Sequence, residues 1–264
     1  RLVQAEALEA QDRAEEAVEV LRLVKVGSPW RADAQMQLAE TLARMDQADD
    51  ARAMVADAAK STRRDILARA ADFYRTAGDY AEAVALYDRL MALDTAAGAP
   101  DWRVLAARAM SRNAGGDWAG AEADLLRALE LEPDQPELLN SLGYNWIDRG
   151  EKLEAGMALI QRAVAARPDL GHIVDSYGWA HFRLGRYEEA VPYLERAAAL
   201  APTEAEIIDH LGDAYWHAGR QKEARYAWTE ALRLKPEETR EAALKAKLER
   251  GLPAAASASL AARP

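Results

Sequence analysis

The feature that most constrains this chain is a 34-residue period in its C-terminal half. Gly178 and Gly212 are 34 residues apart, and Ala190 and Ala224 show the same offset. The further pairs at this offset are Gly185 and Gly219, Ala197 and Ala231, and Pro202 and Pro236. A repeat of this length predicts a stack of similar units, each of which contacts its neighbours, instead of one globular core.

Each repeated unit is expected to contain two α-helices. Apolar residues recur at steps of three and four, as in Ile208, Leu211 and Tyr215, which is the spacing of one helix face. Gly178 and Gly212 fall in the middle of such helices, where glycine costs about 1 kcal/mol relative to alanine. We therefore expect these glycines to allow two helices to approach closely.

Other glycines and prolines mark where the helices end. Gly185 and Gly219 stand between the two helices of a unit, where glycine tolerates a positive φ. Pro202 and Pro236 end their units, because proline does not continue a helix. Pro192 is expected in the first turn of its helix, where no backbone donor is lost.

The period extends toward the N-terminus with looser matches. The spacing predicts a solenoid over residues 1–236, followed by a capping helix at 237–250 that covers the last apolar face. An Ala/Ser tail at 251–264 has no periodicity and is expected to be flexible. The expected units are 1–29, 30–63, 64–99, 100–133, 134–168, 169–202 and 203–236.

The pattern Leu142-Gly143, then Gly150, Ala163 and Pro168, resembles the tetratricopeptide repeat family. This resemblance implies an all-α, right-handed α-solenoid of about seven helix-turn-helix units, used to bind other proteins. The chain departs from the family pattern at Arg108 and Arg112, which stand where core Leu and Tyr are expected. This departure predicts either disturbed packing between Met110 and Trp118 or buried ion pairing there.

Three runs give a second resemblance. Residues 140–150, 175–180 and 209–216 are similar to bacterial repeat proteins, many of which look like outer-membrane lipoproteins facing the periplasm. One branch is similar to the adaptor of a C-terminal processing protease. The resemblance implies a periplasmic, outer-membrane-associated location, with membrane contact only through a lipid anchor preceding Arg1; a cytoplasmic location is the alternative.

The first helices of the units are expected to line a concave groove that binds a protein or an extended peptide. The rows of residues beside the mid-helix glycines place aromatic and acidic side chains there. The predicted partner-binding residues are Asn140, Tyr144, Asp175, Trp179, Phe182, Asp209, Asp213, Trp216 and His217. In the alternative interpretation, the rings pack between adjacent repeats and do not face a ligand.

Several other kinds of site are disfavoured. The 44 acidic and 34 basic residues give a net charge of −10, which repels nucleic acid. Seven residues separate His210 from His217, about 10 Å along a helix, so no metal site is predicted. His181 is expected to be a hydrogen-bonded core residue. Adjacent carboxylates such as Glu188 and Glu189 favour a helix start over acid–base catalysis, and we expect no enzyme activity and no cofactor.

These features predict a non-catalytic scaffold or adaptor, with a role in bacterial envelope proteolysis or assembly. Two alternatives stay open. The chain could be a structural protein that self-associates, with the tail after Gly251 entering a neighbour's groove, or a regulatory region of a larger enzyme.

Overall fold

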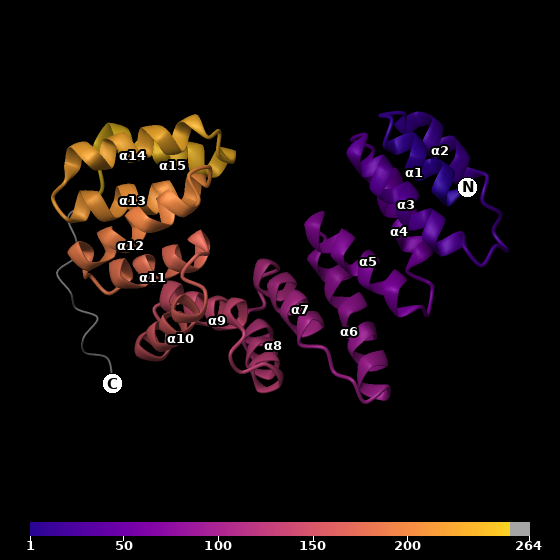
Figure 1. The fold of residues 1–264 in the computed structure, drawn as a ribbon, viewed down its shortest axis with the longest axis horizontal. Helices are drawn as coiled ribbons and strands as arrows, with labels where there is room; N and C mark the ends of the chain where they lie inside the picture. The colour runs from indigo at the N-terminus through magenta and orange to yellow at the C-terminus, as the bar shows by residue number, and fades with distance from the viewer. Residues whose placement is uncertain (254–264) are drawn as a thin grey trace. The chain divides into compact units, whose positions relative to one another are not determined.

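A computed structural model describes residues 1–253, and all regular secondary structure in this range is α-helical (Figure 1). The helices are α1 (Leu2–Glu9), α2 (Ala14–Arg22), α3 (Arg31–Arg44), α4 (Ala48–Ala58), α5 (Arg64–Thr76), α6 (Tyr80–Ala96), α7 (Trp102–Ala114), α8 (Trp118–Leu131), α9 (Pro136–Arg149), α10 (Leu153–Ala166), α11 (Gly171–Arg183), α12 (Tyr187–Leu200), α13 (Ala205–His217), α14 (Gln221–Arg233) and α15 (Glu238–Arg250). The predicted all-α solenoid is confirmed.

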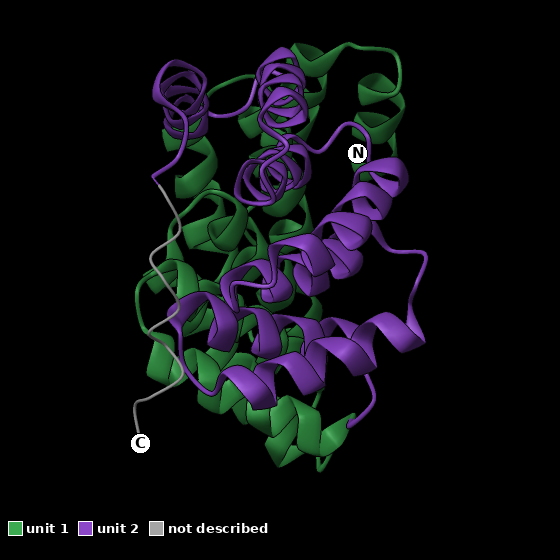
Figure 2. Ribbon diagram, turned by 90° about the vertical axis from the view of Figure 1, so that its left-hand side faces the viewer, with its two compact units in different colours: residues 1–132 green, residues 133–264 purple. Residues whose placement is uncertain are grey.

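The helices divide between two compact units, residues 1–132 (unit 1) and residues 133–264 (unit 2) (Figure 2). Within each unit, odd-numbered helices pack against the helix that follows, from α1 with α2 to α13 with α14. Each of the seven repeats expected from the sequence period contains one such helix pair, and α15 follows the last pair. The predicted tail lies outside the described residues from position 254 onward.

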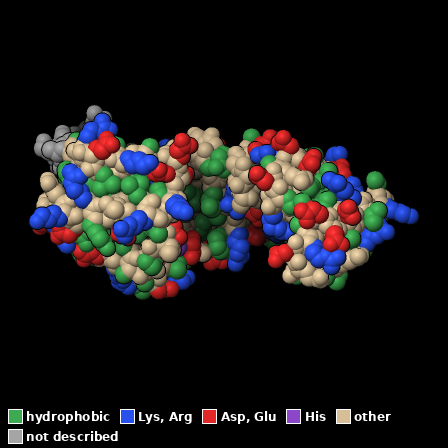
Figure 3. All heavy atoms as spheres, turned by 90° about the horizontal axis from the view of Figure 1, so that it is seen from above, with side chains coloured by type: hydrophobic (Ala, Val, Ile, Leu, Met, Phe, Trp, Pro, Cys, Tyr) green, Lys and Arg blue, Asp and Glu red, His purple; other side chains and the backbone are tan. Residues whose placement is uncertain are grey.

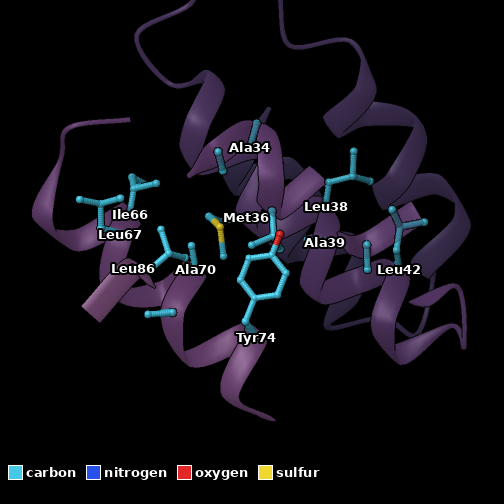
Figure 4. Close-up of a cluster of buried hydrophobic side chains, with 14 of the residues drawn as sticks. Ala34, Met36, Leu38, Ala39, Leu42, Ile66, Leu67, Ala70, Tyr74 and Leu86 are labelled. Carbon is cyan, nitrogen blue, oxygen red and sulfur yellow. The ribbon is translucent and has the colours of Figure 1, made fainter. Parts of the chain in front are cut away.

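The core of unit 1 contains many alanines between larger apolar side chains. Ala39, Ala51 and Ala70 are fully buried, and small residues let helices pack closely. Figure 4 shows Tyr74 of α5 pointing toward Met36 of α3 inside this cluster. Neighbouring helix pairs are therefore joined by side chains that interleave across the first helices.

The mid-helix glycines of unit 2 lie where helices approach most closely. A Cβ added to Gly143 in α9 would come within 2.7 Å of the Gly156 carbonyl oxygen in α10. A Cβ at Gly212 would lie 2.4 Å from the Trp228 ring. The close approach predicted from the sequence is confirmed, and larger residues at these positions would force the helices apart.

The turns between paired helices use positive φ angles. Gly185 has φ +75° and Gly219 has φ +80°, as expected for these positions. In unit 1, Asp12 and Asp46 adopt φ +57° and +61° in the corresponding turns. Aspartate is one of the few residue types that tolerate this conformation, which explains how the early repeats dispense with glycine there.

The prediction for Pro192 is wrong. Helix α12 begins at Tyr187, so Pro192 is its sixth residue and lies inside the helix. A proline in the interior removes one backbone hydrogen bond to the residue four positions earlier. Nevertheless, α12 continues to Leu200 and buries Ala190, Val191 and Leu194.

The expected ion pairing near Arg108 and Arg112 is present. The Arg108 guanidinium forms a hydrogen bond of 2.8 Å from Nε to Asp124, and Arg112 Nη1 donates to the same carboxylate at 2.8 Å. Asp124 in α8 is only 4% exposed. Asp88 in α6 accepts a further bond from Arg108. Two arginines thus replace apolar core residues by sharing one buried carboxylate.

Candidate functional site: a pocket on the first helices of unit 2

A pocket of about 490 Å³ is formed by the first helices of three successive pairs, α9, α11 and α13. Helix α11 contacts both α9 and α13. The lining residues are Asn140, Ser141, Tyr144, Asn145, Gly171, His172, Asp175, Ser176, Ala201, Glu204, Glu206, Ile207 and His210. All of them belong to unit 2.

Three of the predicted partner-binding residues line this pocket, namely Asn140, Tyr144 and Asp175. They are brought together because they lie beside the mid-helix glycines of α9 and α11. Sequence reasoning missed Glu204 and Glu206, which enter from the N-terminal end of α13. Glu204 is the N-cap residue of α13 and Glu206 lies in its first turn, where acidic residues are favoured by the helix dipole whether or not they bind a ligand.

A buried charged pair forms one wall of the pocket. Nδ1 of His210 lies 3.0 Å and 3.1 Å from the two carboxylate oxygens of Asp175. Both residues are less than a tenth exposed. Burial alone would lower the pKa of His210, but the charge and hydrogen bond of Asp175 raise it overall. His210 was considered only as a metal ligand in the sequence, yet it connects two repeats.

The pocket lining also includes a hydrogen-bond acceptor without a donor among residues 1–253. Asn140 Oδ1 is buried and accepts no hydrogen bond from any residue that the structure describes. Ser176, which also lines the pocket, donates its hydroxyl to the His172 carbonyl oxygen at 2.9 Å. Burial raises the pKa of the Tyr144 hydroxyl, and the charges of Asp148, Glu206 and Asp175 raise it further. Tyr144 therefore stays protonated and neutral near pH 7.

The predicted rings of α11 form a stack. The Trp179 ring stacks on Phe182, with ring centroids 4.6 Å apart, and on His210, with centroids 4.0 Å apart. His217 meets the edge of Phe182 and stacks on Tyr187 at 4.8 Å. These side chains pack α11 against α13 and α12, which is the geometry of the alternative interpretation. Their role in partner binding stays a prediction.

The remaining predicted residues, Trp216, Asp209 and Asp213, are covered by α15 and the residues after it. Lys247 of α15 donates to Asp209 at 2.6 Å and to Asp213 at 2.7 Å. The Trp216 indole N–H donates to the Leu252 carbonyl oxygen at 3.0 Å. This part of the first-helix surface is therefore occupied by the chain itself.

His181 is buried beside Tyr177 and Tyr193, as expected for a core residue. Its expected hydrogen bonding is present only as a close contact: Nδ1 lies 3.3 Å from a Glu189 carboxylate oxygen in α12, without the alignment of a regular hydrogen bond. Burial lowers the pKa of His181, so the neutral imidazole is favoured.

Charge and composition set further limits on the site. Figure 3 shows acidic and basic side chains interspersed on the visible face. In the described part of the chain, no three His, Asp or Glu side chains are grouped in a way that could hold a metal ion. None of the helices in residues 1–253 has the length and apolar character needed to cross a membrane.

Comparison with known proteins gives matches along most of the chain. The family model described as tetratricopeptide repeat matches residues 3–237. The TPR repeat-containing protein PA4667 of Pseudomonas aeruginosa is 36% identical over 93 residues, which are 35% of this chain and 16% of that protein. This chain thus matches only a small part of that relative's length.

Two solved structures show the same fold. A tetratricopeptide repeat protein from Parabacteroides merdae aligns with a TM-score of 0.76 at 14% identity, covering 94% of this chain and 96% of that one. The Cut9–Hcn1 structure of APC/C aligns with a TM-score of 0.66 at 16% identity, covering 94% of this chain and 48% of that one. At these identities the likeness concerns the fold alone.

Proposed function

Because this chain belongs to the tetratricopeptide repeat family, we propose that it is an adaptor that binds an extended segment of a partner protein across α9, α11 and α13. Proteins with this fold generally mediate protein–protein interactions, and the fold is typical of non-catalytic scaffolds. The observation that carries the proposal is the 490 Å³ pocket, in which side chains from three successive repeats surround one space. A segment lying across repeats would contact all three walls at once.

The direct test is site-specific photo-crosslinking. A benzoylphenylalanine at His172, which is exposed at the pocket, should form an adduct with a partner protein in an extract of the source organism. The same probe at Tyr226, which is 69% exposed on the second helix α14, is the matched control. Equal labelling at both positions, or no adduct at position 172, would refute binding at this pocket.

For the partner's identity, we propose a C-terminal processing protease of the bacterial envelope. The support is the similarity of residues 140–150, 175–180 and 209–216 to adaptors of such proteases. On this proposal the chain functions in the periplasm, held at the outer membrane by a lipid anchor. Cleavage of a model substrate by the purified protease should accelerate when the chain is added, and fractionation should recover the chain with the outer membrane. An unchanged cleavage rate would contradict the proposed partner.

Self-association is a second candidate, favoured by an apolar surface in unit 1. Val3, Leu23 and Trp30 are 76%, 61% and 59% exposed and line a groove of about 850 Å³ with Leu2 and Val24. Apolar surface of this kind is typical of interaction sites. Light scattering should give a mass above that of one chain, reduced by Trp30→Glu. A monomeric mass for the unmodified chain would exclude this candidate.

A further inference from the structure

In each of the helices α9, α11 and α13, the same position of the repeat carries a hydrogen-bond acceptor. Asn140 in α9, Asp175 in α11 and Asp209 in α13 all stand three residues before the mid-helix glycine of their helix. They therefore occupy equivalent places in successive repeats, so the hydrogen-bond donors that the three side chains receive can be compared.

The two aspartates each bind a nitrogen from the helix that lies two elements later in the chain. Asp175 pairs with His210 from α13. Asp209 receives Lys247 from α15 at 2.6 Å, and Arg240 of the same helix lies 3.4 Å from its other oxygen. In both repeats, a basic side chain reaches back to the acceptor of the preceding first helix.

Asn140 lacks this partner for a reason that is visible in the sequence. Ser176 occupies the place in α11 that His210 occupies in α13, two residues before the glycine. The serine side chain is short, and its hydroxyl bonds to His172 in its own helix. Asn140 Oδ1 is therefore left buried without a donor from the described residues, and the 490 Å³ pocket opens beside it.

The charges around the pocket favour a cation. Glu204, Glu206 and Asp175 contribute three carboxylates to the lining. Asp175 bonds to His210, and Glu206 pairs with Arg240 at 3.0 Å and lies 4.0 Å from His210 Nε2, while its side chain stays 53% exposed. Glu204 makes no ion pair with any residue the structure describes. Ile207 and the Tyr144 ring supply apolar surface for an alkyl stem.

We propose that this pocket binds a lysine or arginine side chain of the partner segment, whose N–H donates to Asn140 Oδ1. The ligand's cation then takes the place that His210 and Lys247 take in the next two repeats. This inference rests on the proposed function, because it names the chemistry of the segment that the adaptor would bind.

The test uses side-chain mimics on the full chain. Titration with n-butylguanidinium and n-butylammonium at constant ionic strength should give saturable NMR shifts of the backbone amides of Ser141 and His172, which line the pocket and are present in every variant. The neutral analogue n-butanol should give none. Asn140→Leu should weaken binding about tenfold or more, because it removes an acceptor for a charged donor. Asn145→Leu is the matched control, since Asn145 lines the same pocket but bonds to Ser141 of its own helix, and it should retain affinity within about twofold.

A gain-of-pair variant makes the test independent of lost stability. The double substitution Asn140→Asp with Ser176→His should recreate the Asp175–His210 arrangement one repeat earlier and block the cationic probes without unfolding the chain. Equal shifts with n-butanol, or unchanged binding in Asn140→Leu, would overturn the inference. If a partner crosslinks at position 172 but cations do not bind, the pocket chemistry is wrong and the adaptor function stands. If cations bind but no partner crosslinks, the pocket chemistry stands and the proposed adaptor function is wrong.

Discussion

His210 of α13 binds both carboxylate oxygens of Asp175 in α11, at 3.0 Å and 3.1 Å, within a wall of the candidate pocket. The pair is buried, and the Trp179 ring lies 4.0 Å from the imidazole, centroid to centroid. A titratable contact of this kind makes the stability of unit 2 depend on pH.

The pair should stabilise the fold more at acidic than at basic pH. Because the pKa of His210 is raised in the folded state, its stabilisation is complete below the unfolded pKa of about 6.5 and is lost as pH rises through the folded pKa. We expect the difference in melting temperature between the unmodified chain and His210→Gln to shrink as pH rises from about 6 toward 8.

The two chains must be compared with each other at every pH, because two other histidines change the stability with pH in the opposite direction. Burial lowers the pKa of His181 and of His217, so both favour the fold at higher pH. Their contributions are the same in the two chains and cancel. A difference in melting temperature that is constant with pH would contradict the charged pair.

Removing the ammonium beside Asp209 and Asp213 should detach α15. Both carboxylates are nearly buried, and removing one partner of a buried ion pair costs about 3–5 kcal/mol. We expect Lys247→Met to lower the urea midpoint strongly, and Lys245→Met, whose partner Glu241 is exposed, to have little effect. Burial already raises the pKa of Asp213, and Lys247 opposes this. The decrease in the urea midpoint caused by Lys247→Met should therefore be smaller at pH 5 than at pH 7. An equal decrease at both pH values would contradict this prediction.

The carboxylate of Asp124 should matter more than any exposed acid in unit 1. Asp124→Ala leaves Arg108 and Arg112 without their shared buried partner, at a cost of about 3–5 kcal/mol. Glu130→Ala is the control, because Glu130 and Arg127 pair on the surface with both side chains more than half exposed, and such pairs contribute little. Chemical denaturation followed by circular dichroism compares the two. Similar losses in both variants would show that Asp124 has no special role.

Gly251 should be intolerant of a side chain. It has φ +70°, and a Cβ would lie 2.1 Å from the Trp216 ring. Gly251→Ala should displace Leu252 from Trp216 and cost about 1–3 kcal/mol through strain and overpacking. Hydrogen exchange of the Trp216 indole N–H should accelerate. Gly27→Ala, which meets nothing within 4 Å, should leave that exchange unchanged; acceleration in both would point to a general loss of stability.

The helices were predictable from the sequence because their apolar spacing and turn glycines repeat at one period. The pocket residues Asn140, Tyr144 and Asp175 were found for the same reason, since equivalent positions in stacked helices face the same side. The unpaired Asn140 acceptor in the pocket was not predictable, because the Ser176 hydroxyl bonds within its own helix and not to Asn140. No periodic rule distinguishes a serine that bonds within its own helix from one that bonds to a neighbouring helix.

Trp216 shows where the periodic argument fails. Trp216 lies 34 residues after Phe182, at the equivalent position of the repeat, and was expected to face a ligand. In the structure, the residues after α15 fold onto it. This contact depends on Gly251 and Leu252, which lie beyond the last repeat and obey no period. Residues that end a solenoid must satisfy contacts that interior repeats obtain from their neighbours.

The contacts of Lys247 and His210 with earlier helices also determine how unit 2 would respond to force. Lys247 joins α15 to α13, and His210 joins α13 to α11, so each of these two first helices is held by a helix that lies two elements later in the chain. Tension applied at the C-terminal side would meet the Lys247 contacts before it reached the Asp175–His210 pair. The repeats would then yield in sequence from the C-terminal end, because each contacts only its neighbours.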